Sequence, residues 1–161
     1  MKKGRQRLAV FELPATGGCR CGRFRFSFDS KPFVAYTCHC RECRKLTGSA
    51  FLTCMHIPAE SLTLLKGDPA CDLRQTDSGN SLITYFCDRC GGNMYAKNSA
   101  RPFVVTLHVG SLDKPEKVEV NAHIWLKQKL SWVEIPDGHR RFDESGDWLE
   151  DYKDDPSKYG E

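Results

Sequence analysis

Short runs of alternating or continuous apolar residues recur along most of the chain and predict β-strands. Residues 23–28, RFRFSF, place Phe24, Phe26 and Phe28 at every second position, so the three rings share one face of a strand. Similar runs, rich in β-branched and aromatic residues, occupy residues 33–40, 49–57, 81–87, 102–109 and 117–126. The pattern therefore predicts a mainly β protein.

Turn-forming residues separate these runs, at residues 30–32, 66–69, 77–80 and 112–115. Helical signals are few. The segment RECRKLTG, residues 41–48, predicts one or two helical turns that end at Gly48. The segment PAESL, residues 58–62, predicts a second short helix with Pro58 near its start. The chain has no internal repeat and no interior linker, so we expect one domain.

The C-terminal stretch differs in composition from the rest of the chain. Residues 144–161 are acidic and poor in aliphatic side chains, which is typical of a peripheral tail. Trp148 and Tyr152 are the two side chains expected to anchor it. We therefore expect a domain over residues 1–143, followed by an acidic tail.

Charge and hydropathy narrow the possible partners and the location. The chain of 161 residues carries 24 Lys and Arg against 21 Asp and Glu, a formal charge of +3 with no large basic block. This balance gives no electrostatic argument for nucleic acid. No stretch approaches the roughly 18 apolar residues of a membrane helix, and the run LAVF near the start is too short for a secretory signal. We expect a soluble cytoplasmic protein.

Cysteine usage is the main anomaly in the composition. The chain has nine cysteines, an odd number, and a reducing compartment disfavours a disulfide framework. Clustered thiols in such a compartment indicate metal. Seven of the nine fall in three tight groups: Cys19 and Cys21; Cys38, Cys40 and Cys43; and Cys87 and Cys90. Cys54 and Cys71 stand alone and are expected to be buried as small hydrophobic side chains.

Two of the groups combine naturally into one closed metal site. Cys19 and Cys21 form C-x-C, and in an extended segment both side chains point to the same side. Cys87 and Cys90 form C-x-x-C followed by glycine, the zinc-knuckle turn. Together they supply the four thiolates of a structural zinc site. A competing arrangement, as in a zinc ribbon, pairs Cys87 and Cys90 with the C-x-x-C in residues 40–43, and spacing alone does not decide.

Either arrangement leaves a set of three thiols: Cys38, Cys40 and Cys43 in the first, and Cys19, Cys21 and Cys38 in the ribbon arrangement. Three protein ligands with an open fourth position are typical of reactive zinc, whereas structural zinc is closed. The other interpretation is a second structural site, completed by His39 or another side chain. Zinc with three thiolates carries a net negative charge, which disfavours activation of water and favours binding of a further sulfur ligand. The leftover trio therefore indicates thiol chemistry rather than hydrolysis.

Taken in order, these motifs are similar to those of the glutathione-dependent formaldehyde-activating (Gfa) family, which also includes centromere protein V. The matching segments are GGCRCGRFRF, CHCRECRKLTGSAF, FCDRCGGNMY, VGSLD and HIW followed by WVEIPDG, between Gly17 and Phe142. The resemblance implies a β-tent fold of small antiparallel sheets stapled by zinc. It also implies two zinc ions per chain: a structural one held by Cys19, Cys21, Cys87 and Cys90, and a second one, near the substrate, held by Cys38, Cys40 and Cys43.

The activity for which this family is named joins formaldehyde to the thiol of glutathione, giving S-hydroxymethylglutathione. The resemblance thus implies a zinc-dependent carbon–sulfur lyase-like enzyme acting on a small thiol–aldehyde adduct, with Cys38, Cys40 and Cys43 as the catalytic zinc ligands. One alternative is a lyase, dehydratase or isomerase for another small organic substrate. The other is a non-catalytic zinc-binding interaction module, like centromere protein V.

Four further residues are predicted to line the substrate site. Ser49 and Phe51 follow the metal loop at alternating positions, and His123 and Trp125 share one face of the strand predicted over residues 117–126. His39 lies between two predicted ligands and points to the opposite side from both. We therefore expect it beside the metal site or at the surface. For the remaining histidines, the sequence predicts no partner: His56, His108 and His139.

Overall fold

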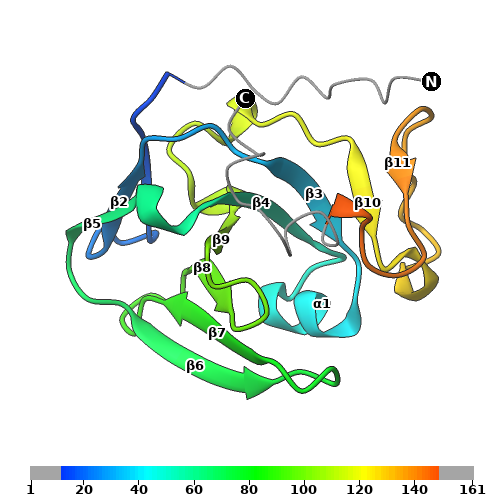
Figure 1. Cartoon of the computed structure of the whole chain (residues 1–161), viewed down its shortest axis with the longest axis horizontal. Coiled ribbons are helices and arrows are strands. Elements are labelled where there is room, and N and C mark those ends of the chain that lie inside the picture. Colours follow the sequence, from blue (N-terminus) through cyan, green and yellow to red (C-terminus); the bar gives the residue numbers. More distant parts are fainter. Residues whose placement is uncertain (1–11, 149–161) are drawn as a thin grey trace.

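The computed structural model of the chain describes residues 12–148, which form two β-sheets joined by short connections (Figure 1). The smaller sheet has three antiparallel strands in the order β1-β2-β5. Their bounds are β1 (Ala15–Gly18), β2 (Arg25–Phe28) and β5 (Leu62–Lys66). The alternating phenylalanines behave as predicted, since Phe24, Phe26 and Phe28 are all buried.

The larger sheet has eight strands in the order β11-β10-β3-β4-β9-β8-β7-β6. Neighbours are antiparallel except at β10, which runs parallel to both β3 and β11. The prediction of a mainly β protein is confirmed. The strand bounds are β3 (Val34–Cys38), β4 (Leu52–Pro58), β6 (Ala70–Gln75), β7 (Ser81–Phe86), β8 (Asn93–Asn98), β9 (Val104–His108), β10 (Ala122–Ile124) and β11 (Arg140–Arg141).

The helices are short. The predicted helix that ends at Gly48 is present as α1 (Arg41–Thr47), and Gly48 closes it in the left-handed conformation, with φ of 62°. The second predicted helix is reduced to a single 3₁₀ turn, because the residues after it pair with β2 as strand β5. The 3₁₀ turns are η1 (Ala59–Ser61), η2 (Val109–Ser111), η3 (Pro115–Lys117) and η4 (Leu126–Gln128). None of the helices within residues 12–148 has the length and apolar content to cross a bilayer.

Two apolar clusters lie on opposite faces of the central strands of the larger sheet. The first contains Phe26 and Phe28 from the small sheet together with Met55 and Leu107 from the large one. The second lies on the other face and is formed by Val34, Tyr36, Cys38, Leu52, Cys54, Val104, Ala122, Ile124 and Trp148. Alternate residues of β3 and β4 enter alternate clusters, as the strand pleat requires.

Trp148 is 6% exposed and packs its indole 5.2 Å from the ring of Tyr36 and edge-on to Phe142. The chain therefore remains packed on the sheet past residue 143. Tyr152, the other proposed anchor, lies outside the described residues. The boundary between a domain over residues 1–143 and an acidic tail stays a prediction.

Candidate metal centres

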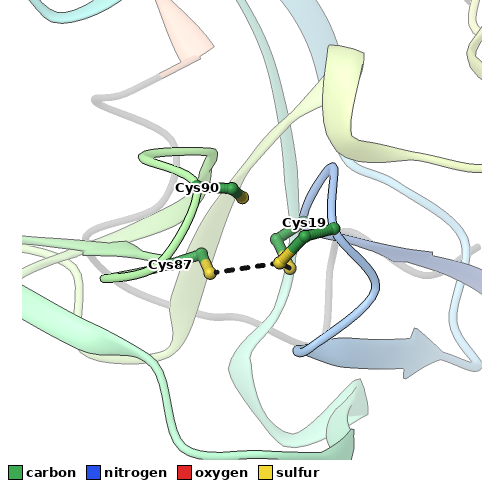
Figure 2. A group of neighbouring side chains, drawn as sticks. Cys19, Cys87 and Cys90 are labelled. Atoms are coloured by element: carbon green, nitrogen blue, oxygen red, sulfur yellow. Dashed lines mark hydrogen bonds between the residues drawn. The ribbon is translucent and has the colours of Figure 1, made fainter.

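Four cysteines from two loops meet at one point. Cys19 and Cys21 lie in the loop between β1 and β2, and Cys87 and Cys90 in the loop between β7 and β8; Figure 2 shows Cys19, Cys87 and Cys90 converging. The Cys21 sulfur lies 3.6 Å from that of Cys19 and 3.7 Å from that of Cys87. Sulfurs placed tetrahedrally around zinc, at about 2.3 Å from it, are about 3.8 Å apart. The cluster thus has the size of a zinc site.

Tight turns direct backbone N–H groups at these sulfurs. Cys19 begins a turn, rather than the extended segment expected from the sequence, and its carbonyl accepts from the N–H of Gly22. The Phe24 N–H donates to the Cys19 sulfur at 3.3 Å. Burial raises the pKa of the Cys19 thiol, but this hydrogen bond and those with neighbouring thiols outweigh it and leave the pKa below its ordinary value.

The second loop has the geometry expected of a zinc knuckle. The Gly91 N–H donates to the Cys87 carbonyl at 2.8 Å, and Gly91 takes a positive φ of 69°, which glycine adopts without strain. Backbone N–H groups, that of Gly92 foremost, lower the pKa of the Cys90 thiol to about 6. Burial raises the pKa of the Cys87 thiol to about 11. Each loop therefore favours the thiolate, the form that binds metal, at one cysteine, Cys19 or Cys90.

The second cysteine group is built by a strand end and a helix start. Cys38 ends β3, Cys40 is the N-cap residue of α1, and Cys43 lies in the first turn of α1. The Cys43 N–H donates to the Cys40 sulfur at 3.3 Å, the usual capping geometry with sulfur as the acceptor. The three sulfurs lie within 4.8 Å of one another. The zinc-ribbon pairing is therefore wrong, because Cys40 and Cys43 group with Cys38 and not with the knuckle.

The charge balance of this trio favours a cation. Hydrogen bonds from Cys38, from Cys43 and from backbone N–H groups lower the pKa of the Cys40 thiol well below its ordinary value. The hydrogen bond with Cys40, and then burial, raises the pKa of Cys38. Hydrogen bonds with Cys38 and Cys40, and then burial, raise the pKa of Cys43. Three thiolates this close together repel one another, so a bound cation would be needed to keep all three deprotonated. Within residues 12–148, no histidine or carboxylate joins the trio.

His39 is fully buried and belongs to a polar chain beside the trio. Its Nε2 lies 3.0 Å from the Thr37 hydroxyl, which also contacts Nδ1 of His123. Nε2 of His123 then lies 2.9 Å from Nδ1 of His139, and these two rings stack. These contacting side chains form a row that runs from the interior next to Cys38 to the half-buried His139. His39 is therefore neither a ligand in this arrangement nor a surface residue.

The family model for the glutathione-dependent formaldehyde-activating enzyme matches residues 14–128 of this chain, a span that includes both cysteine groups. The chain belongs to this family. No curated protein matches it. Among solved structures, the crystal structure of a Rhodobacter sphaeroides protein is similar, with 18% sequence identity and a TM-score of 0.49, covering 79% of this chain and 98% of that chain.

The Gfa chain places the four predicted substrate-site residues in different surroundings. Ser49 is exposed just after α1, and Phe51 is half-buried with its ring 5.2 Å from that of His39. The prediction that His123 and Trp125 share one face of a strand is wrong. Strand β10 ends before Trp125, which takes a left-handed conformation with φ of 59° and packs on the second apolar cluster, with which Cys40 also packs.

A second buried polar group in this Gfa chain lies on the same sheet face as Cys38. The Tyr36 hydroxyl is 2.8 Å from Nε2 of His56, and both side chains are buried. Cys54, opposite Tyr36 in the register, is buried as expected. Cys71 is exposed on β6, contrary to expectation. Sequence spacing carries no signal for the Tyr36–His56 pair, since only the pairing of β3 with β4 brings the two together.

Proposed function

We propose that this protein is a zinc-dependent carbon–sulfur lyase-like enzyme that acts on a small thiol–aldehyde adduct of the S-hydroxymethylglutathione type. One observation carries the proposal: two cysteine groups of unequal size, four sulfurs in one and three in the other, in a member of the Gfa family. The first set fills a tetrahedral site, and the second leaves one position for a small molecule. Two zinc ions per chain follow from this count.

The trio fits zinc by its chemistry. Zinc held by three thiolates would supply a soft, charge-compensated position that accepts sulfur in preference to water. The backbone N–H of Cys43 stabilises the Cys40 thiolate, and the apolar cluster around Cys38 keeps water from one side of the sulfurs. In the synthetic direction a carbon–sulfur bond forms and the thiol proton passes to the carbonyl oxygen. In the lyase direction that bond breaks, and the hydroxyl proton returns to sulfur.

Residues around the trio are proposed to position the adduct. Ser49 is exposed and can orient the hydroxymethyl oxygen through its side-chain hydroxyl, while Phe51 and Trp125 offer half-buried apolar surface. His123 is 6% exposed and contacts Thr37 and His139. We therefore propose that it supports the residues around the trio and does not contact the adduct directly. Bringing thiol and carbonyl together would supply most of the acceleration.

Exchange of formaldehyde with glutathione, followed by NMR exchange spectroscopy at low concentration, tests the proposal. The protein should raise the exchange rate above the uncatalysed rate, and Cys43→Ser should remove the increase. Cys71→Ser is the matched control, since Cys71 is exposed and outside both groups. An exchange rate equal to the uncatalysed one, with both zinc ions bound, would rule out this reaction and direct attention to other small organic substrates.

A further inference from the structure

Strand β6 forms one edge of the larger sheet. Among the described strands it pairs with β7 alone, and Figure 1 shows it at the margin of the molecule. Its central residues Cys71, Asp72 and Leu73 are all exposed, Leu73 to 59%. An open edge with an exposed apolar residue at its centre is a template for pairing with another strand.

The backbone groups of β6 that face outward can be assigned from the adjoining hairpin. The Thr76 N–H donates to the Asn80 carbonyl at 2.8 Å, so this pair is a hydrogen-bonded one. Hydrogen-bonded pairs alternate along an antiparallel ladder, which turns the N–H and C=O of Arg74 and Asp72 toward β7. The corresponding groups of Leu73 and Cys71 therefore point to the open edge.

The side chains of β6 carry a pattern that is complementary to itself. Asp72 and Arg74 lie on the same face, on either side of Leu73, which points to the opposite face. Within residues 12–148, neither Asp72 nor Arg74 takes part in an ion pair. On the other face, Leu73 lies opposite the half-buried Ile83 of β7.

We propose that β6 pairs antiparallel with β6 of a second copy of this chain, about a two-fold axis at Leu73, to form one continuous sheet. In this register, Asp72 of each copy lies opposite Arg74 of the other copy, so the two-fold axis generates two such pairs. The outward backbone groups of the two Leu73 residues face one another, so they can exchange both hydrogen bonds. The two leucine side chains extend the apolar row begun by Ile83 across the axis.

The charges select this register over its neighbours. Moving the axis by one residue keeps the outward-facing backbone groups opposite each other. It brings Asp72 opposite Asp72, or Arg74 opposite Arg74, and like charges directly opposite destabilise a sheet. Cys71 falls opposite Gln75 rather than opposite another Cys71, so the pairing does not depend on a disulfide.

Sedimentation velocity on the full chain with reductant, over a range of micromolar concentrations, tests the proposal. The wild-type protein should sediment as a species of twice the 18.3 kDa chain mass. Asp72→Arg and Arg74→Asp, made singly, should each weaken self-association about tenfold, because each places like charges opposite one another twice. The double variant carrying both substitutions restores opposite charges and should restore the dimer.

Leu73→Pro is the backbone control. The N–H that proline removes faces the open edge and pairs with no strand within residues 12–148, so the fold should survive while the dimer is lost. Circular dichroism and melting temperature of each variant establish folding. A monomeric wild-type protein, or a dimer that both single charge variants leave unchanged, would overturn the proposal. Weakening by the single variants with no recovery in the double variant would overturn it as well.

Discussion

The four-cysteine and three-cysteine sites use the same ligand atom in two different structural positions. The first joins the loop between β1 and β2 to the loop between β7 and β8, and so links the small sheet to the large one. The second lies within one continuous segment, from Cys38 to Cys43, at the end of β3 and the start of α1. The difference suggests that the first site stabilises the fold, whereas the second depends on a fold that forms without it.

The largest expected effect is a difference in folding between variants of the two sites. Cys87→Ser should abolish soluble, folded protein, because a structural zinc contributes about 10–16 kcal/mol of apparent binding free energy, and whole domains are stable by only about 5–15 kcal/mol. Cys43→Ser should keep the fold and lose one zinc ion. Melting temperature and elemental analysis measure both. Equal unfolding of the two variants would show that the trio is a second structural site.

The next effect tests the apolar cluster against which the trio packs. Trp148 is buried against Tyr36 and Phe142, so Trp148→Ala should cost about 3–5 kcal/mol in chemical unfolding. Trp132 is 71% exposed, and Trp132→Ala serves as the matched control with an effect within about 0.5 kcal/mol. A similar, small loss for both variants would mean that residues beyond 143 contribute little to the sheet face that carries Cys38.

A smaller effect depends on pH and comes from His56. Burial, and to a lesser degree the charge of Arg101, lowers the pKa of His56 to about 3 from 6.5. Between pH 3 and pH 6.5, His56 therefore binds a proton in the unfolded chain but not in the folded one. The free energy of unfolding is therefore unaffected by the titration of His56 above pH 6.5. It falls by about 1.4 kcal/mol per pH unit as the pH drops from 6.5 toward 3.

Comparison with His56→Gln isolates this contribution, since acid release of metal affects both proteins alike. Glutamine still offers an acceptor to the Tyr36 hydroxyl but does not titrate. Urea unfolding between pH 7 and pH 4.5 should show the wild-type protein losing stability faster than the variant. Parallel pH profiles would contradict the assigned burial of a neutral histidine.

The smallest effect on stability, and the sharpest on metal content, is expected from mild chelation. The trio offers three sulfurs to a metal ion and the other group offers four, so a chelator should remove one zinc ion quickly while the far-ultraviolet circular dichroism stays unchanged. Removal of the second ion should coincide with unfolding. Release of both ions in a single step, with or without unfolding, would remove the distinction between the sites.

The local parts of both cysteine groups could be predicted from the sequence, because they depend on short turns. The C-x-x-C with a following glycine predicts the knuckle at Cys87, and Gly48 predicts the end of α1. The choice of partner for the knuckle could not be predicted from spacing. It depends on the loop between β1 and β2 reaching the loop between β7 and β8, a contact between residues nearly 70 positions apart.

Strand β6 and the contact between His123 and His139 could not be predicted from the sequence either, and the reasons are physical. Strand β6 carries Asp72 and Arg74 and has no buried face, so it lacks the apolar alternation that identified β2. The His123–His139 contact arises because β11 pairs parallel with β10, and a two-residue strand leaves no pattern. Trp125 leaves its predicted strand because the chain turns there into η4.

Visible absorption of the protein loaded with cobalt(II) tests the central claim most directly, because cobalt reports the number and kind of its ligands. Addition of glutathione should change the bands of one cobalt ion, as a fourth sulfur enters the position that Cys38, Cys40 and Cys43 leave open. In Cys43→Ser, loaded at the four-cysteine site only, glutathione should change nothing. A wild-type spectrum that does not respond to glutathione would contradict an open, thiol-accepting site at the trio.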